Sequence, residues 1–273
     1  MRRAESVASH GVRFLFATVF VAGCAYSASA SAANDCKKPV YLTFDTGHME
    51  VAPAILQTLL EHRVQATFFA ANERTKSGDG SLGEYWAVWW KKAADQGHEF
   101  ASHTFDHVYW RGDLATQPVS FRIKPSAGAQ MGQESVATPA QYCKQLDQSS
   151  QRLQFMTGKP TLPLFRAPGG KTSAALLAAA KDCGYAHVGW ADAGFLGDEL
   201  PSEKFSNSHL LGKALRTIRS GDILMAHLGI WSRKDPWAPA NLEPLITGLK
   251  AQGFCFDTLR NHPDYKGWIT QRS

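Results

Sequence analysis

The segment His-Thr-Phe-Asp-His carries two histidines, His103 and His107, four residues apart. This spacing brings two imidazoles to one face of a helix or of a tight turn. Two neutral imidazoles with open positions for water suit Zn²⁺, or another divalent first-row metal such as Co²⁺. We therefore predict a metal site at this pair. The competing interpretation is a chance pair in a chain with 10 histidines.

Three other side chains that are capable of acid–base or ionic chemistry, Asp45, Arg166 and His227, stand at the ends of apolar runs. An unpaired buried carboxylate costs on the order of several kcal/mol, so Asp45 needs a cation, and Arg166 is the obvious partner. One interpretation is a structural ion pair. The other is a general base held in orientation by Arg166, with His227 donating a proton to a leaving amine. Alone, His227 would be read as a core histidine.

Short runs rich in strand-forming residues alternate with segments of helical periodicity, which predicts a single α/β domain built as a parallel barrel. In such barrels the catalytic residues lie at the carboxyl ends of the strands. The polar residues above would then converge on one mouth. The seven strand-like runs are residues 39–45, 66–71, 98–103, 163–167, 186–192, 222–228 and 255–259.

Helical segments are expected between most of these runs. Residues 52–60 show an apolar stripe, residues 174–183 follow Ser173 as a candidate N-cap, and another helix follows Asn241. The stretch 109–138 is irregular and too long for an ordinary connection, so we interpret it as a functional loop or a minor insertion.

Taken in order, these motifs resemble the polysaccharide deacetylase family, the nodulation-deacetylase homology domain of the carbohydrate esterases, over residues 40–259. The resemblance implies a distorted (β/α)7 barrel and metal-assisted removal of acetyl groups from N-acetylated sugars. It makes Asp45 the catalytic base and Arg166 the residue that orients it. His227 becomes the catalytic acid, and the pair described first becomes two of the metal ligands.

The same resemblance suggests residues that would contact the substrate. Met225 would line the pocket for the acetyl group, and the backbone N–H of Gly169, next to Pro168, would bind the oxyanion of the tetrahedral intermediate. Trp231 and Trp237 follow the last of the chemistry-bearing histidines, and tryptophan faces stack on sugar rings. Ordinary packing of a proline-bearing loop is the alternative for both.

The chain departs from the family pattern at Thr46. The family usually has a second aspartate here, which is the third metal ligand, and a neutral hydroxyl is a far poorer ligand. We expect weaker metal binding, an extra water, or recruitment of a neighbour such as His48. The peptidoglycan muramic-acid deacetylase branch resembles this chain in replacing the same aspartate with a neutral side chain, which favours a cell-wall substrate.

A second departure concerns the acidic residue that tunes the catalytic histidine in the family. This chain offers Asp192, which is closer to the end of the fifth strand-like run, and Asp198, whose spacing fits better. Both remain candidates for the partner of His227.

Residues 1–33 are predicted to be an export signal and a short linker, and residues 34–273 the deacetylase-like domain. Arginines precede a short apolar run, 14–22, and Ala-Ser-Ala at 28–30 fits signal cleavage. The run is too short to span a bilayer comfortably. A lipoprotein box ending at Cys24 is the alternative. We expect a monomer without an integral membrane segment, in the periplasm or outside the cell.

Four cysteines remain after the signal: Cys36, Cys143, Cys183 and Cys255. In an oxidising compartment they permit two disulfides in one of three connectivities. We favour Cys36–Cys255, because the first and last strands of a closed barrel are neighbours, and Cys143–Cys183. Four buried thiols are the alternative.

Length and charge limit the function classes. With 273 residues and 44% hydrophobic content the chain has enough apolar side chains for one sizeable core. The net charge of +5 is scattered without a basic block, which argues against nucleic acid as a partner. The leading hypothesis is a metal-dependent hydrolase of an N-acetylated glycan. A hydrolase of another small amide and a non-catalytic glycan-binding protein with a degraded metal site are the alternatives.

Overall fold

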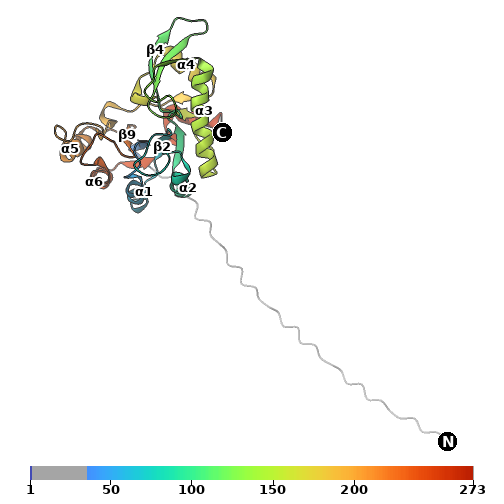
Figure 1. Cartoon of the computed structure of the whole chain (residues 1–273). Coiled ribbons are helices and arrows are strands. Elements are labelled where there is room, and N and C mark those ends of the chain that lie inside the picture. Colours follow the sequence, from blue (N-terminus) through green and yellow to red (C-terminus); the bar gives the residue numbers. More distant parts are fainter. Residues whose placement is uncertain (2–35, 273) are drawn as a thin grey trace. The chain divides into compact units, whose positions relative to one another are not determined.

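The structure, a computed structural model, describes residue 1 and residues 36–272 (Figure 1). The predicted export signal and Cys24 lie outside the residues that are described. From Cys36 onward the chain forms one unit. Within the described residues no helix combines the length and apolar character that a membrane crossing requires.

Seven parallel strands form the central sheet, and each lies within one of the seven predicted runs, which confirms the α/β barrel class. The strand that follows Tyr185 is much shorter than predicted, because the chain leaves the sheet after two residues. The strands are β1 (Pro39–Asp45), β2 (Thr67–Ala70), β3 (Glu99–Ser102), β7 (Leu164–Phe165), β8 (Ala186–His187), β9 (Ile223–His227) and β10 (Cys255–Asp257).

The sheet curves around so that its two ends meet. Its order is β10-β1-β2-β3-β7-β8, and β9 also pairs with β1. The segment after β8 completes the ring: Ala191 N–H donates to the carbonyl of Ile223 at 3.2 Å, and Leu196 N–H donates to that of Met225 at 3.3 Å. This irregular closure distorts the barrel, because single hydrogen bonds replace a full strand pairing at that point.

Alternation along β1 decides which side chains face the barrel interior. Val40, Leu42 and Phe44 belong to the large core between the strands and the outer helices, whereas Tyr41 belongs to a separate cluster inside the barrel. Successive side chains of a strand point to opposite faces, so Asp45 lies on the same inward face as Tyr41. The strand thus places a carboxylate at the open end of the barrel.

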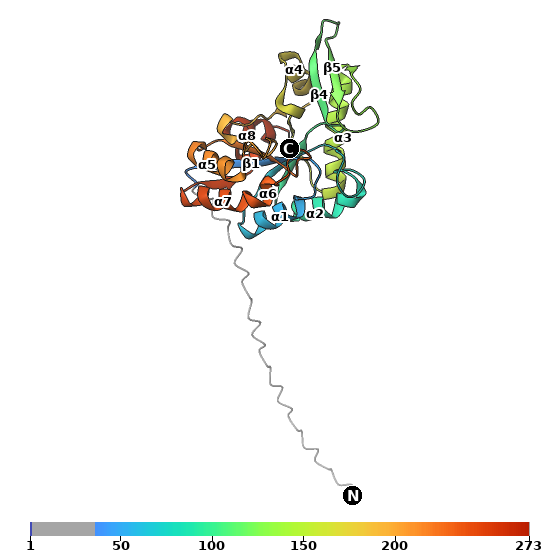
Figure 2. The same cartoon turned by 60° about the vertical axis from the view of Figure 1, so that its left-hand side comes forward.

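The helices cover the outside of this barrel (Figure 2). The predicted helices at 52–60, 174–183 and after Asn241 are confirmed, and the Ser173 hydroxyl accepts a hydrogen bond from Leu176 N–H at 3.1 Å as an N-cap. The helices are α1 (Ala52–Glu61), α2 (Ala87–Asp95), α3 (Pro139–Thr157), α4 (Ala174–Asp182), α5 (Asn207–Thr217), α6 (Trp237–Ala240), α7 (Leu242–Ala251) and α8 (Pro263–Thr270). Short 3₁₀ turns are η1 (Glu84–Trp86), η2 (Pro168–Gly170), η3 (Asp192–Gly194) and η4 (Leu259–Asn261).

The stretch expected to be irregular is instead mostly a three-stranded antiparallel sheet. It comprises β4 (Val108–Leu114), β5 (Ser120–Pro125) and β6 (Ser135–Ala137). Phe121 and Ile123 alternate with polar residues and pack toward α3, as expected for a sheet with one buried face. Both cartoon views show it beside α3 and α4, at the end of the domain away from α1 and α2 (Figures 1 and 2).

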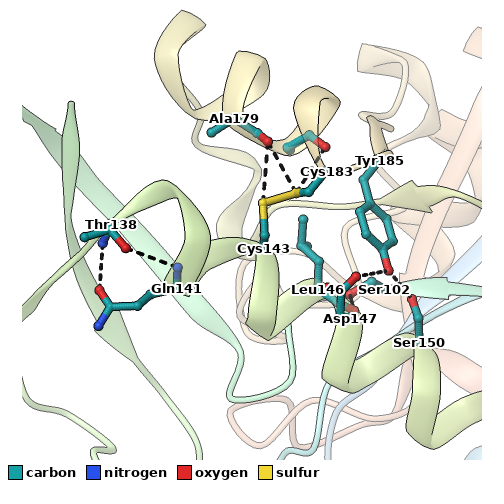
Figure 3. Close-up of a disulfide and its surroundings, with 11 residues drawn as sticks. Ser102, Thr138, Gln141, Cys143, Leu146, Asp147, Ser150, Ala179, Cys183 and Tyr185 are labelled. Atoms are coloured by element: carbon teal, nitrogen blue, oxygen red, sulfur yellow. Dashed lines mark hydrogen bonds between the residues drawn. A yellow bond between two sulfur atoms is a disulfide. The ribbon is translucent and has the colours of Figure 1, made fainter. Parts of the chain in front are cut away.

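Both predicted disulfides are present. Cys36–Cys255 joins the segment before β1 to β10, and Cys143–Cys183 joins α3 to the residue after α4, with Cα atoms 6.0 and 6.1 Å apart respectively. Figure 3 shows the second bridge beside Tyr185, whose hydroxyl forms hydrogen bonds with side chains of α3. Disulfides are typical of proteins that fold outside the cytoplasm.

Candidate active site

The four strand-end residues, Asp45, His103, Arg166 and His227, come together at one end of the barrel. Asp45 and His227 are directly paired in register on adjacent parallel strands. His103 and Arg166 each follow the last residue of their strand, β3 and β7. Parallel strands end at the same edge of a sheet, so residues separated by more than 100 positions in sequence become neighbours.

Asp45 is 3% exposed and is contacted on two sides. Its Oδ1 lies 2.7 Å from Nη1 of Arg166, and its Oδ2 lies 3.6 Å from Nε2 of His103. Burial opposes ionisation, but the guanidinium of Arg166, which also donates a hydrogen bond, and the charged imidazole of His227 outweigh it and lower the pKa of Asp45 below its usual value. The carboxylate is therefore charged at neutral pH and available to accept a proton.

Arg166 is fully buried, and the fold holds its guanidinium in place. Its Nε and Nη2 donate to the carbonyls of Val188 and Gly189, each at 3.3 Å, and the ring of Phe69 lies 4.2 Å beneath it. A planar guanidinium fixed in this way presents a donor to Asp45 in one direction. Arg166 thus orients the carboxylate as well as neutralising it.

The two histidines predicted to bind metal face each other across a tight turn. Thr104 and His107 both have positive φ, of 60° and 49°, so the four-residue spacing is realised by a turn and not by a helix. The Nε2 atoms of His103 and His107 are 3.2 Å apart. Two nitrogens about 2.0–2.1 Å from one tetrahedral Zn²⁺ are separated by about 3.3 Å, so the pair fits a single ion.

Hydrogen bonds fix which nitrogen of His103 is free. Its Nδ1 lies 2.9 Å from the carbonyl of Arg166, which only accepts, so Nδ1 carries the proton and Nε2 keeps its lone pair. Burial, assisted by His107 and opposed by Asp45, lowers the pKa of His103 to about 4. A neutral imidazole with its lone pair toward a second imidazole is the protonation state that metal binding requires.

On the other side of Asp45, His227 pairs with Asp198. The His227 N–H and Nδ1–H donate to the two carboxylate oxygens at 2.6 and 3.0 Å. Burial lowers the pKa of His227, but Asp198, together with Asp45 and Glu199, outweighs it and raises it to about 10. Asp192, the other candidate, is exposed at the start of η3. The structure thus places Asp198 and not Asp192 against the histidine.

Thr46 and His48, the two candidates for a further ligand, have other contacts. The Thr46 hydroxyl accepts from the N–H of Ala71 at 3.1 Å and donates to Oε2 of Glu73 at 2.6 Å. His48 packs edge-on against Trp231, with ring centroids 5.5 Å apart, and lines the same small cavity as Asp198. Within residues 36–272 no group of three His, Cys, Asp or Glu side chains is already arranged as a metal site.

The residues predicted to contact the substrate acetyl group lie near this centre. Met225 is buried on β9 two residues before His227, so it shares the inward face and lies one layer deeper. Pro168 and Gly169 lie in the turn η2, which begins at the third residue after β7. Gly169 has a φ of 68°, and a Cβ there would lie 2.8 Å from the ring of Tyr109, so only glycine fits.

The two tryptophans of the loop after β9 differ in exposure. Trp231 is 51% exposed, and the guanidinium of Arg74 lies 4.5 Å from its ring. Trp237 is 3% exposed, belongs to the large core and lines the small cavity beside His227. Their role in glycan binding stays a prediction, for which Trp231 offers the accessible face.

Sequence reasoning missed Glu73, which contacts both Thr46 and His107. Besides its bond with Thr46, its Oε1 lies 3.8 Å from Nδ1 of His107. The signal was available: Glu73 is the third residue after β2, at the same end of the barrel as the other strand-end residues. Ser126 was missed as well, and it lies in the turn after β5, 2.5 Å from the same Nδ1.

The fold and this cluster define a class of α/β barrel proteins that gather carboxylate, guanidinium and imidazole groups at the carboxyl ends of parallel strands. The chain belongs to the polysaccharide deacetylase family, whose profile, described as "Polysaccharide deacetylase", matches residues 32–188. The match spans more than half of the sequence and includes Asp45, both paired histidines and Arg166.

Individual relatives agree with this membership. The chain is 28% identical over 230 residues to the peptidoglycan-N-acetylmuramic acid deacetylase PdaA of Bacillus subtilis, covering 83% of this chain and 72% of that protein. Among solved structures, a family 4 acetyl xylan esterase of Clostridium thermocellum in complex with a cobalt ion has a TM-score of 0.62 at 22% identity, covering 84% of this chain and 92% of that one. A family pseudoenzyme of Bacillus anthracis has a TM-score of 0.60 at 21% identity, covering 83% and 65% respectively.

Proposed function

We propose that this protein is a metal-dependent hydrolase that removes N-acetyl groups from an exported or cell-wall polysaccharide, with peptidoglycan as the first substrate to test. The observation that carries the proposal is the surroundings of Asp45. On one side, Asp45 contacts the fixed guanidinium of Arg166 and the neutral imidazole of His103. On the other side, its register neighbour is His227, which the carboxylate of Asp198 keeps charged. A binding protein does not need a base and an acid at one centre.

The residues present fit the metal that the family implies. His103 and His107 would hold it through Nε2, since those two atoms are 3.2 Å apart and the Nδ1 of His103 is engaged by a carbonyl. When bound, a divalent ion acidifies water and polarises a carbonyl oxygen. Zn²⁺ is the ion we expect, with Co²⁺ as a substitute.

Proton transfer falls to two residues of the chain. Asp45 accepts a proton from the attacking water, because its lowered pKa keeps it ionised and Arg166 holds it in one orientation. As the tetrahedral intermediate collapses, His227 donates a proton to the departing amine nitrogen. Its raised pKa keeps it in the protonated form that this step requires.

Other residues would bind the reacting group. The backbone N–H of Gly169 stabilises the oxyanion, and Met225 lines the space for the acetyl methyl. Trp231 would stack on a sugar ring at the mouth. Together these contacts would hold the acetylated amide at the centre of the site.

The preference for peptidoglycan rests on two features. Thr46 is a neutral side chain at the position of the second aspartate, a replacement that resembles the muramic-acid deacetylase branch, and PdaA is among the relatives. The disulfides and the predicted export signal support a location outside the cytoplasm, where such a glycan is found. We propose secretion as a monomer, with lipid attachment at Cys24 as the alternative.

The test measures metal content of the protein without its signal and release of acetate from peptidoglycan, chitooligosaccharide and acetylated xylan. We expect metal near one ion per chain and chelator-sensitive acetate release, highest from peptidoglycan. Asp45→Asn should lower turnover by about 10³-fold while glycan binding is kept, because only the base is removed.

Two outcomes would contradict the proposal. Neither metal nor acetate, even after Zn²⁺ or Co²⁺ is added, would favour a non-catalytic glycan-binding protein. Full turnover by Asp45→Asn would remove Asp45 from the mechanism. Acetate release from xylan alone would keep the hydrolase and replace the substrate.

A further inference from the structure

Glu73 stands beside the position where the family's third ligand is missing. It follows β2, the strand that pairs with β1, so its backbone lies next to residue 46 at the open end of the barrel. The hydroxyl of Thr46 accepts from Ala71 N–H and therefore uses its single proton to donate to Oε2 of Glu73. Thr46, directly after β1, thus anchors a carboxylate from the segment after β2.

The backbone around Glu73 is held as firmly as a strand. Its N–H donates to the Ser81 hydroxyl and its carbonyl accepts from Ser81 N–H, both at 2.9 Å. Ser81 is fully buried, and its hydroxyl donates in turn to the carbonyl of Ala71. These three hydrogen bonds fix the loop, so that the Glu73 carboxylate stays close to the histidine pair.

In the described part of the chain the Glu73 carboxylate has no lysine or arginine partner. Its side chain is only 20% exposed, its Oε1 lies 3.8 Å from Nδ1 of His107, and among the described residues no lysine or arginine forms an ion pair with it. A carboxylate that is largely removed from water is costly unless a cation compensates it. A cation bound at the histidine pair would compensate the charge of the Glu73 carboxylate.

We propose that Glu73, in the segment after β2, is the carboxylate ligand of the metal site and replaces the aspartate missing at position 46, directly after β1, with Thr46 positioning it. This inference rests on the proposed function, because it assumes that His103 and His107 hold a metal ion. A glutamate is one methylene longer than an aspartate, which suits a ligand that reaches across from the neighbouring strand. Carboxylate oxygen with two imidazoles is a donor set that Zn²⁺ and Co²⁺ accept.

The alternative role for Glu73 is to orient His107 through Nδ1 without touching the metal. Residues of that kind cost about 10–100-fold in metal affinity when they are removed. A direct ligand costs more, and its loss is repaired only by another carboxylate at the same centre. The two roles therefore differ in how substitutions at positions 46 and 73 combine.

The experiment is a double-mutant cycle on metal affinity in the full-length mature protein, with Glu73→Gln, Thr46→Asp and the two combined. Zn²⁺ dissociation constants are measured by competition with a chromophoric chelator, and visible spectra are recorded with Co²⁺. We expect Glu73→Gln to weaken Zn²⁺ binding by more than about 100-fold. Thr46→Asp should restore it in the Gln background and change it little in the wild type. The Co²⁺ spectrum should change in Glu73→Gln and return in the double variant.

Glu61→Gln is the matched control, because it removes an exposed glutamate at the end of α1. It should leave affinity unchanged. If His103→Ala loses the metal, a loss below about 100-fold in Glu73→Gln, or an equal gain from Thr46→Asp in both backgrounds, overturns the ligand role. No metal binding by the wild type overturns the proposed function and this inference together.

Discussion

Two buried histidines on either side of Asp45 have opposite electrostatic surroundings. His103 lies 3.6 Å from Asp45 and has its pKa lowered to about 4, whereas His227 is the register neighbour of Asp45 and has its pKa raised to about 10. Their side chains are only 14% and 3% exposed for His227 and His103, so burial alone does not separate them. The difference between their pKa values comes from the hydrogen-bond partner of Nδ1.

The Nδ1 of His103 donates to a backbone carbonyl, which carries no net charge, and its Nε2 faces a second imidazole. The Nδ1 of His227 donates to the carboxylate of Asp198, which stabilises the imidazolium form. One side of the barrel mouth is therefore suited to hold a cation and the other to deliver a proton. The same residue type serves two tasks because its neighbours differ.

The largest effects are expected when the histidine on one side of Asp45 or the other is removed. His103→Ala should lower metal content and acetate release together, with metal affinity reduced at least about 100-fold. His227→Gln should lower kcat by about 10²–10⁴-fold and leave metal content unchanged, because only the proton donor is removed. Metal analysis and kinetics on both variants check this.

His209→Ala removes an exposed histidine on α5 and serves as the control for both measurements. Stoichiometric metal in His103→Ala would contradict its ligand role. Loss of metal in His227→Gln would mean that the two sides are not separate in function.

A smaller effect tests the electrostatic origin of the difference. His227 donates its proton only in the acid form, so activity should be lost as the pH rises through its pKa, near 10. Asp198→Asn keeps an acceptor for the His227 N–H but removes the charge. The alkaline limb of the pH profile of kcat/KM should then move down by several units, toward the ordinary histidine value of about 6.5.

Asp192→Asn is the control for this pH profile, because it removes an exposed carboxylate from the same segment between β8 and β9. Its alkaline limb should stay in place. An unchanged limb in Asp198→Asn would show that this carboxylate does not set the protonation of His227.

The smallest effect concerns the loop after β9. Trp231→Ala should raise KM for a glycan about 5-fold with kcat unchanged, since one stacking contact contributes roughly 1 kcal/mol. Phe155→Ala on α3 is matched, because Phe155 is also exposed with an arginine guanidinium over its ring, 5.4 Å away. Equal KM values for Trp231→Ala and the wild type would remove Trp231 from the substrate-binding surface.

The expected strands, three helices and the Cys36–Cys255 disulfide could be predicted from the sequence because their signals are local or follow from strand order, and Cys143–Cys183 followed as the remaining pair. The position of Asp45 at the end of the run 39–45 predicted that it lies at the barrel mouth, and the first and last strands of a barrel are neighbours whatever lies between. The sheet at 108–137 was missed because Gly, Pro and Gln interrupt its alternation, and because its buried face depends on α3. A local sequence pattern cannot predict that a distant helix will cover one face of the sheet.

The sequence by itself determined which residue types stand at the strand ends, and therefore the family and the acid, base and imidazole groups of the site. Only the tertiary structure decided their pairings. Asp198 was chosen over Asp192 by the path of the chain between β8 and β9, and Glu73 was brought to Thr46 by the pairing of β1 with β2. Spacing in sequence is blind to these contacts, because they join residues on different strands through the curvature of the sheet.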